Sequence, residues 1–232
     1  MSLWVRATGS GPPLVCVHGL GVSSRYFAPL MRELAGDFRM LAPDLPGYGR
    51  TAKPRRPLGI DGLAEALGDW LEVQRLGPVP LLANSMGCQI VTELVAREPQ
   101  RAGRLILVGP TVDPRLRGNL VRFALRDSLR EPPAVLWIVL TDDLRFGLAR
   151  LLTTIGFLLA DRIEERLPRI DAPALVIHGG RDGFVSLPWS ERVAALLPAG
   201  RLAVVADGAH AVHYSRPAEV AALVRAFLAE ER

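Results

Sequence analysis

Short apolar runs alternate with longer amphipathic segments along most of this chain. Several runs are apolar at every position, which is typical of strands that are covered on both faces of a sheet. Strands are predicted at Leu3–Ala7, Leu14–Val17, Met40–Ala42, Val79–Ala83, Arg104–Val108, Ala174–Ile177 and Leu202–Val205. Helices are predicted at Ser24–Leu34, Ile60–Leu76, Met86–Arg97, Ser190–Leu197 and Pro217–Ala229. This alternation predicts an α/β fold: a mostly parallel central sheet with helices on both faces.

Residues 112–169 interrupt the alternation. Leucine and isoleucine recur there at helical spacing, at Leu148, Leu151, Leu152, Ile155, Leu158 and Leu159, without a convincing strand. We therefore expect a helical cap inserted into a core made of residues 1–111 and 170–232. Ligands bind beyond the carboxyl ends of strands in open α/β sheets, so an insertion at that edge would shape a pocket. An ordinary extra helical layer is the alternative interpretation.

The composition narrows the class of protein. With 232 residues, 49% of them hydrophobic, the chain can form one α/β domain with an insertion. The formal net charge is +4, but the densest basic cluster, 53–56, is short and lacks interleaved aromatics, so we expect no nucleic-acid partner. A secretory signal and a full membrane span are absent from the pattern, which favours a cytoplasmic protein without stable membrane insertion. The oligomeric state is left unknown.

Metal and redox chemistry are not expected. The two cysteines, Cys16 and Cys88, are too few for a disulfide framework and are interpreted as small core residues. The sequence contains no His-Glu-x-x-His or paired-cysteine motif, and the loop 18–21 lacks the pattern of a phosphate-binding loop. We therefore expect neither a metal nor a cofactor.

The most informative position is Ser85. A predicted buried strand runs into Ala83-Asn84-Ser85-Met86-Gly87, and a helical pattern follows at once. A serine flanked by small residues in a strand-to-helix turn is typical of a nucleophile elbow, which lifts the hydroxyl out of the fold. The simpler interpretation of such a serine is a helix N-cap. The small residues two positions to either side favour the nucleophile.

A serine hydroxyl needs a base within hydrogen-bond reach and a group that orients the base. Asp182 and His210 each follow a predicted strand, as Ser85 does, so all three are expected at one edge of the sheet. We predict Ser85 as nucleophile, His210 as base and Asp182 as the orienting acid. Their order along the chain is the one that α/β-hydrolases use. Less favoured candidates are Asp207 and Asp171 for the acid and His213 for the base, whereas His178 is expected to pack at a strand end.

The charge that develops on a substrate oxygen needs backbone N–H donors, and losing one costs on the order of 3–4 kcal/mol. The residue after the nucleophile, Met86, is predicted to supply one donor. The loop His18-Gly19-Leu20-Gly21 is predicted to supply the other, from Leu20 or alternatively Gly21. His18 is expected to orient this loop rather than to transfer protons.

These segments together resemble the α/β-hydrolase superfamily, in the branch with an inserted helical cap. The resemblance covers nearly the whole chain outside residues 112–169 and rests on 18–21, 44–49, 84–87, 179–182 and 208–210. It implies a structural role for Asp44, Gly47 and Gly49. The chain departs from the family pattern in three ways: Ala83 stands where glycine is usual, only one strand precedes Leu14, and the cap is compact.

Family members with serine at the elbow include carboxylesterases, thioesterases and C–C bond hydrolases of ring-cleavage products. The leading hypothesis is a serine hydrolase that cleaves a carboxylic ester of a small to medium hydrophobic substrate. The cap aromatics Phe123, Trp137, Phe146 and Phe157 are expected either to form an apolar pocket or simply to pack on the core. A C–C hydrolase would need an arginine for the substrate carboxylate, with Arg25, Arg122 and Arg126 as candidates. A non-catalytic ligand-binding member of the fold is the third hypothesis.

Overall fold

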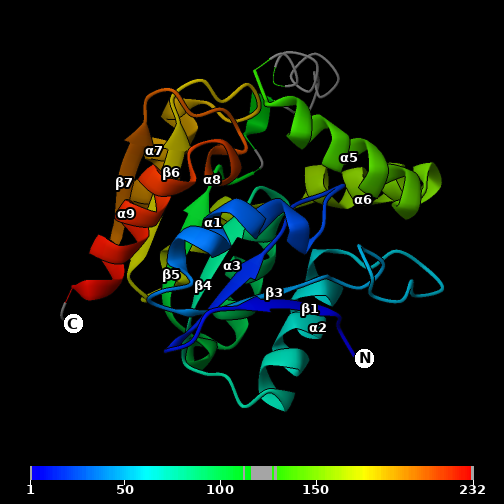
Figure 1. The fold of residues 1–232 in the computed structure, drawn as a ribbon, viewed down its shortest axis with the longest axis horizontal. Coiled ribbons are helices and arrows are strands. Elements are labelled where there is room, and N and C mark those ends of the chain that lie inside the picture. The colour runs from blue at the N-terminus through cyan, green and yellow to red at the C-terminus, as the bar shows by residue number, and fades with distance from the viewer. Residues whose placement is uncertain (1, 112, 116–126, 128–129, 231–232) are drawn as a thin grey trace.

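Seven strands form one sheet at the centre of the protein (Figure 1). The computed structural model describes residues 2–111, 113–115, 127 and 130–230. The strands are β1 (Val5–Thr8), β2 (Pro13–Val17), β3 (Arg39–Pro43), β4 (Val79–Asn84), β5 (Ala102–Val108), β6 (Ala174–Gly179) and β7 (Gly200–Val205). Their order in the sheet is β1-β3-β2-β4-β5-β6-β7. Only the edge pair β1 and β3 is antiparallel, so the predicted α/β fold class is confirmed.

Helices cover both faces of the sheet. One face packs against α1 (Ala28–Leu34) and α9 (Pro217–Ala229), and the other against α2 (Ile60–Val73), α3 (Met86–Arg97) and α7 (Leu187–Leu196). A short helix, α8 (Val212–Ser215), precedes α9. Two buried apolar clusters therefore lie on either side of the strands, and the middle strands contribute to both of them in alternation.

The predicted elements all occur, with ends that shift by a few residues. The bounds of α3 and α9 are as predicted. The predicted helix 24–34 is divided into a 3₁₀ helix, η1 (Ser24–Phe27), and α1, because Pro29 lacks a backbone N–H and suits only a first turn. α7 begins three residues earlier than predicted, since the Ser186 hydroxyl accepts a hydrogen bond from the N–H of Trp189 at 3.2 Å and caps the helix.

The cap segment, defined as residues 112–169, is helical where the structure describes it. It contains α5 (Pro133–Phe146), α6 (Leu148–Ala160) and two 3₁₀ turns, η4 (Ile163–Glu165) and η5 (Leu167–Arg169). Figure 1 shows α5 and α6 side by side, away from the helices that cover the sheet. Gly147 joins them with φ of +96°, a left-handed conformation that favours glycine. The chain thus leaves the sheet after β5 and returns to it at β6.

Candidate active site

Ser85 lies in a sharp turn between β4 and α3. Its φ and ψ are 55° and −124°, which a residue with a side chain adopts at a cost of about 1–3 kcal/mol. Gly87 allows the turn, because a Cβ atom there would lie 2.3 Å from the carbonyl oxygen of Val17. Ala83 is fully buried in the preceding strand, so its methyl group is accommodated where the family usually has glycine. This backbone geometry is that of a nucleophile elbow.

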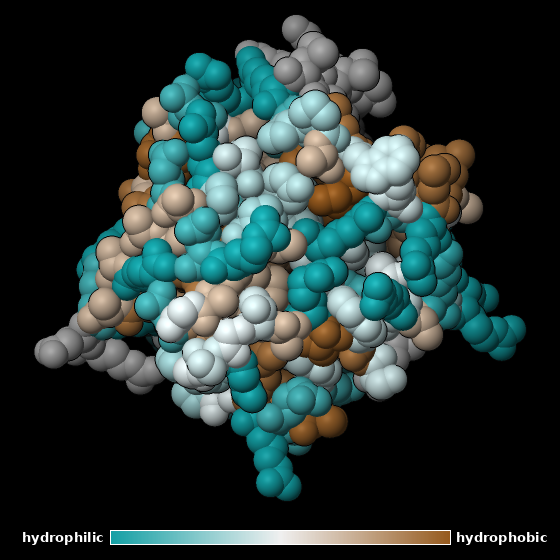
Figure 2. All heavy atoms as spheres, viewed as in Figure 1, coloured by the Kyte–Doolittle hydropathy of each residue, from teal (hydrophilic) through white to brown (hydrophobic). Residues whose placement is uncertain are grey.

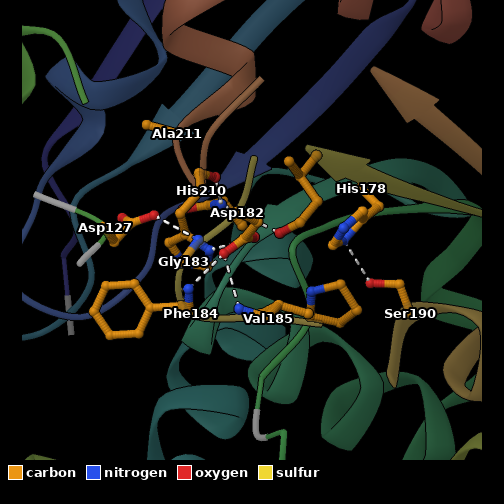
Figure 3. Close-up of polar contacts among 12 residues, drawn as sticks. Asp127, His178, Asp182, Gly183, Phe184, Val185, Ser190, His210 and Ala211 are labelled. Carbon is orange, nitrogen blue, oxygen red and sulfur yellow. Dashed lines mark hydrogen bonds and ion pairs between the residues drawn. The ribbon is translucent and has the colours of Figure 1, made fainter. Parts of the chain in front are cut away.

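Asp182 and His210 form a buried hydrogen-bonded pair (Figure 3). His210 Nδ1 and Asp182 Oδ2 are 2.9 Å apart. The other carboxylate oxygen, Oδ1, accepts the N–H groups of Phe184 at 2.7 Å and Val185 at 2.8 Å. Because an ionised carboxylate only accepts, Nδ1 carries the hydrogen and Nε2 is left free to accept a proton. The acid is thus fixed by its own loop and in turn orients the imidazole.

The environment of His210 favours its protonated form. Burial lowers the pKa of His210, but the negative charge of Asp182 and the hydrogen bond to it outweigh burial, with Asp127 and Glu131 adding to the effect. The net result is a pKa above the usual value near 6.5. His210, in the loop that follows β7, is therefore a stronger base than a free imidazole.

Ser85 and His210 line one cavity of about 200 Å³. The cavity also touches the loop after β2 through Gly19 and Leu20. Its other described lining residues are Val22, Tyr26, Asn84, Thr111, Asp127, Glu131, Val135, Leu136, Val139, Ile155, Leu158 and Phe184. Most of these side chains are apolar, and several belong to α5 and α6. The cap segment therefore forms one wall of the cavity, and the carboxyl edge of the sheet forms another.

The two residues predicted to supply N–H donors for an oxyanion are Met86, which directly follows Ser85, and Leu20, in the loop after β2. Met86 is the first residue of α3, so its N–H has no acceptor within the helix and lies at the positive end of the helix dipole. The loop 18–21 touches the elbow, since a Cβ atom on Gly19 would lie 3.0 Å from the Cβ of Ser85. Leu20 lines the cavity. Their roles as donors stay predictions.

Two hydrogen bonds of the His18 ring fix the position of the loop 18–21. Its Nε2 accepts the N–H of Leu45 at 3.0 Å, so Nδ1 carries the hydrogen and donates to the carbonyl of Gly19 at 2.8 Å. Burial lowers the pKa of His18, which keeps the ring neutral. These contacts agree with the predicted orienting role.

The loop 44–49 has the contacts expected of a structural element. The buried Asp44 carboxylate accepts the N–H groups of Ser24 and Arg50, each at 2.8 Å. Gly49 adopts a φ of +48°, and a Cβ atom there would collide with that carboxylate. The loop thereby connects the end of β3 to η1.

The less favoured candidates lie in other surroundings. His213 is fully buried between Tyr26 and Phe27, and burial lowers its pKa to about 3. His178 packs at the end of β6 and its Nδ1 lies 3.0 Å from the Ser190 hydroxyl (Figure 3).

The alternative candidates for the acid, Asp207 and Asp171, lie at the surface. Asp207 forms an exposed ion pair with Arg181, and Asp171 is exposed. Neither is among the described residues that line the cavity.

Sequence reasoning missed two residues that support the pair of His210 and Asp182. Gly109 follows β5 with φ of +53°, and a Cβ atom there would lie 3.0 Å from His210 Nδ1 and 3.2 Å from Asp182 Oδ2. Asn84 is buried, and its Nδ2 donates to the carbonyls of Val108 at 3.2 Å and His210 at 3.4 Å. A signal for Gly109 was the Gly-Pro pair after a buried strand, which marks a turn.

Of the two expectations for the cap aromatics, pocket formation is wrong for those that the structure describes, and packing on the core holds for Phe146. Trp137 is 64% exposed, and the nearby leucines are exposed as well, at 52%, 74% and 70% for Leu140, Leu144 and Leu148. Figure 2 shows hydrophobic residues at the surface in the region of α5 and α6. Phe146 stacks on Tyr48 with ring centroids 4.3 Å apart, and Phe157 is partly exposed. Helical periodicity turns Val135 and Val139 to the cavity instead. Phe123 lies outside the described residues.

Of the arginines considered for binding a carboxylate, Arg25 is held by the cap segment. Its guanidinium contacts Asp142 at 3.0 Å and the carbonyl of Ile138 at 2.9 Å, and it is not among the cavity-lining residues described. Arg122 and Arg126 lie outside the described residues. Among the residues that the structure does describe, neither lysine nor arginine lines the cavity.

Cys16 and Cys88 are buried, and burial raises the pKa of each thiol, as fits core residues. Within the described ranges, no cluster of three or more His, Cys, Asp or Glu side chains is placed to hold a metal ion. No helix in the described part of the chain is long and apolar enough to cross a membrane.

Sequence comparison identifies the class of protein that this fold and site define. Residues 14–223 match the alpha/beta hydrolase family, and the chain belongs to that family. The resemblance drawn from the sequence is therefore confirmed, and the protein is an enzyme of the α/β-hydrolase type with esterase-like relatives.

Individual relatives extend over almost the whole chain. A protein of Rhizobium rhizogenes, provisionally named carbamate hydrolase RutD, is 31% identical over 93% of this chain and 92% of its own. Esterase YbfF of Escherichia coli is 27% identical over 93% of this chain and 92% of its own. The solved structure of a thermophilic esterase from Thermogutta terrifontis has a TM-score of 0.84 at 22% identity. The alignment covers 97% of this chain and 92% of that one, which shows a shared fold.

Proposed function

We propose that this protein is a serine hydrolase that cleaves carboxylic esters of small to medium hydrophobic substrates through an acyl-enzyme. One observation carries the proposal. Ser85, in a strained strand-to-helix turn, lines the same apolar cavity as His210, whose Nδ1 is hydrogen-bonded to the buried Asp182. Relatives named as esterases support the choice of an ester.

In the proposed reaction the Ser85 hydroxyl attacks the ester carbonyl carbon while His210 Nε2 takes the hydroxyl proton. The tetrahedral oxyanion receives hydrogen bonds from the N–H groups of Leu20 and Met86. The intermediate collapses, the C–O bond to the alcohol breaks, and His210 returns the proton to the departing oxygen. A water molecule then repeats the sequence on the acyl-enzyme, which releases the acid and restores Ser85. Asp182 stabilises the imidazolium in both halves.

The size and lining of the cavity favour a short hydrophobic substrate. Its volume of about 200 Å³ is below the roughly 300–1,000 Å³ typical of sites for drug-sized ligands. The side chains of Val135, Leu136, Val139 and Ile155 provide an apolar wall. We infer that the cap segment, residues 112–169, acts as the cap of this site and sets the chain length that fits.

The alternative of a C–C hydrolase has less support. Its substrate carries a carboxylate, and the charged side chains that line the described part of the cavity are acidic, Asp127 and Glu131. An anionic substrate would find no basic partner among them and would be repelled wherever they are ionised. A ligand-binding member of the fold would not require the strained turn at Ser85, which persists only where the surrounding structure imposes it.

The test is steady-state hydrolysis of p-nitrophenyl esters of graded acyl length by the wild-type protein and by Ser85→Ala. We expect kcat/KM to be highest for short acyl chains, and the variant to lose at least about a thousandfold while it stays folded. Ser190→Ala is the matched control, because it removes a buried serine hydroxyl that contacts a histidine, His178, away from the cavity. Turnover that persists in Ser85→Ala contradicts the proposal.

A further inference from the structure

Glu131 places an unsatisfied carboxylate oxygen beside the cavity. The residue precedes α5, is only 9% exposed, and is one of the cavity-lining residues. Its Oε1 accepts the N–H of Ala211 at 2.6 Å, whereas Oε2 is buried and has no hydrogen-bond partner. A buried polar atom without a partner destabilises the fold, and does so more when it is charged. Such an atom in the wall of a ligand cavity points to a partner on the ligand.

The surroundings of Glu131 favour a positively charged partner. The cap contributes a second carboxyl to the lining, Asp127, whose Oδ1 accepts the N–H of Gly183 at 2.9 Å (Figure 3). The rings of Tyr26 and Phe184 line the same cavity. Among the described lining residues none is a lysine or an arginine. Carboxylates combined with aromatic rings in an apolar wall are suited to ammonium groups.

The position of Glu131 relative to the reacting groups indicates which half of a substrate it would meet. Its carboxylate accepts a hydrogen bond from the N–H of Ala211, the residue that directly follows His210 in the chain. In the reaction proposed above, His210 passes its proton to the leaving alcohol. The contact with Ala211 places the Glu131 carboxylate beside the segment that carries His210, and the leaving group is the half of the substrate that receives a proton from His210.

We propose that Glu131 forms, with the neighbouring aromatic rings, a subsite for an ammonium group on the alcohol half of the substrate. The preferred substrates are then short-chain esters of amino alcohols. This inference rests on the proposed serine hydrolase activity, because the leaving-group side is defined by that reaction.

Glu131 is divided between its neutral and its ionised form near neutral pH. Burial raises the pKa of Glu131 to about 7, and the charges of Asp127 and Asp182 add to that rise, while His210 and the Ala211 N–H oppose it. Tyr26, which shares the cavity, stays neutral because burial raises its pKa well above the usual range. A bound ammonium ion would stabilise the ionised carboxylate and relieve this repulsion.

Two pairs of isosteric esters provide the test. In the first pair, butyrylcholine and 3,3-dimethylbutyl butyrate differ only in the charge on the alcohol half. In the second pair, ethyl 4-(trimethylammonio)butanoate and ethyl 5,5-dimethylhexanoate differ in the charge on the acyl half. Each rate is divided by the rate of alkaline hydrolysis of the same ester, which removes the difference in intrinsic reactivity.

The variant is Glu131→Gln, which keeps an oxygen for the N–H of Ala211 and removes the charge. Glu65→Gln, at an exposed position of α2, is the matched control. We expect the wild-type protein and the control to prefer butyrylcholine over its neutral isostere. In Glu131→Gln that preference should fall about tenfold or more, mainly through KM, because the ammonium group does not take part in bond breaking.

Choline binding provides a readout without turnover. Calorimetry on Ser85→Ala should detect choline, with weaker binding of 3,3-dimethylbutanol. If no ester is cleaved in a Ser85-dependent way but choline binds through Glu131, the proposed activity fails, and an ammonium site at Glu131 stands without its assignment to the alcohol half of an ester. If esters are cleaved without preference for butyrylcholine, or with preference for the charged acyl half, the subsite proposal is overturned and the hydrolase proposal stands. Should Glu131→Gln not fold, the wild-type preferences and the calorimetry decide between these outcomes.

Discussion

Replacing Gly109 by alanine tests whether the His210–Asp182 pair depends on close approach of the backbone after β5. A Cβ atom on Gly109 would lie 3.0 Å from His210 Nδ1, 3.1 Å from His210 Cε1 and 3.2 Å from Asp182 Oδ2. These contacts are a few tenths of an ångström shorter than ordinary van der Waals contact. The methyl group therefore has to push the imidazole, the carboxylate or its own backbone aside.

Two costs can be estimated for Gly109→Ala. The φ of +53° costs a residue with a Cβ atom about 1–2 kcal/mol, which lowers Tm by about 2–8 °C in a chain of this size. A misplacement of about 1 Å at a catalytic group can cost about 100-fold, so a shift of a few tenths of an ångström should lower kcat/KM by about tenfold. The loss should appear in kcat, because the displaced groups act on the reacting atoms.

Gly147→Ala is the matched control for this prediction. Gly147 also has a positive φ, +96°, but a Cβ atom there meets nothing within 4 Å. The variant Gly147→Ala should lose thermal stability as Gly109→Ala does, which thermal unfolding measures. Its kcat/KM for p-nitrophenyl butyrate should equal that of the wild type. Wild-type activity in Gly109→Ala, or an equal loss of activity in Gly147→Ala, would refute the reasoning.

Three further predictions concern the His210–Asp182 pair and the turn at Ser85. Because Asp182 raises the pKa of His210, kcat/KM should fall with decreasing pH through a pKa above 6.5. In Asp182→Asn the carboxylate charge is lost and burial remains, so the pKa of His210 should fall below 6.5. The NMR signals of the imidazole ring protons measure this pKa. An unchanged titration of His210 would contradict this account. Gly87→Ala should prevent stable folding, because its methyl group would lie 2.3 Å from the carbonyl oxygen of Val17; a soluble variant with unchanged Tm would show that the elbow is not constrained in this way.

The sheet could be predicted from the sequence because its middle strands are mostly apolar and are bounded by turn residues. The same periodicity located α3 and α9 to the residue. The division of the segment 24–34 was missed because a proline in the first turn of a helix is compatible with one long helix as well as with two short ones. The local sequence pattern therefore predicts whether a segment is a helix or a strand more reliably than it predicts where that segment begins and ends.

The site was predictable to the extent that topology determines it. Residues that follow parallel strands meet at one edge, which brings Asp182 to His210. Glu131 could not be found in this way, and neither could the close approach of Gly109 to His210, because each depends on contacts between segments that are far apart in sequence. Likewise, the composition of α5 does not reveal which of its apolar residues face the cavity, and Trp137 faces outward.

The most direct test of the central claim is covalent labelling of the intact protein by a fluorophosphonate probe, followed by mass spectrometric mapping of the adduct. Ser85→Ala and Ser190→Ala are labelled beside the wild type. The account predicts an adduct on Ser85 in the wild type and in Ser190→Ala, and none in folded Ser85→Ala. Absence of an adduct from the folded wild-type protein, or an adduct on another residue, would contradict the assignment of Ser85 as an activated nucleophile.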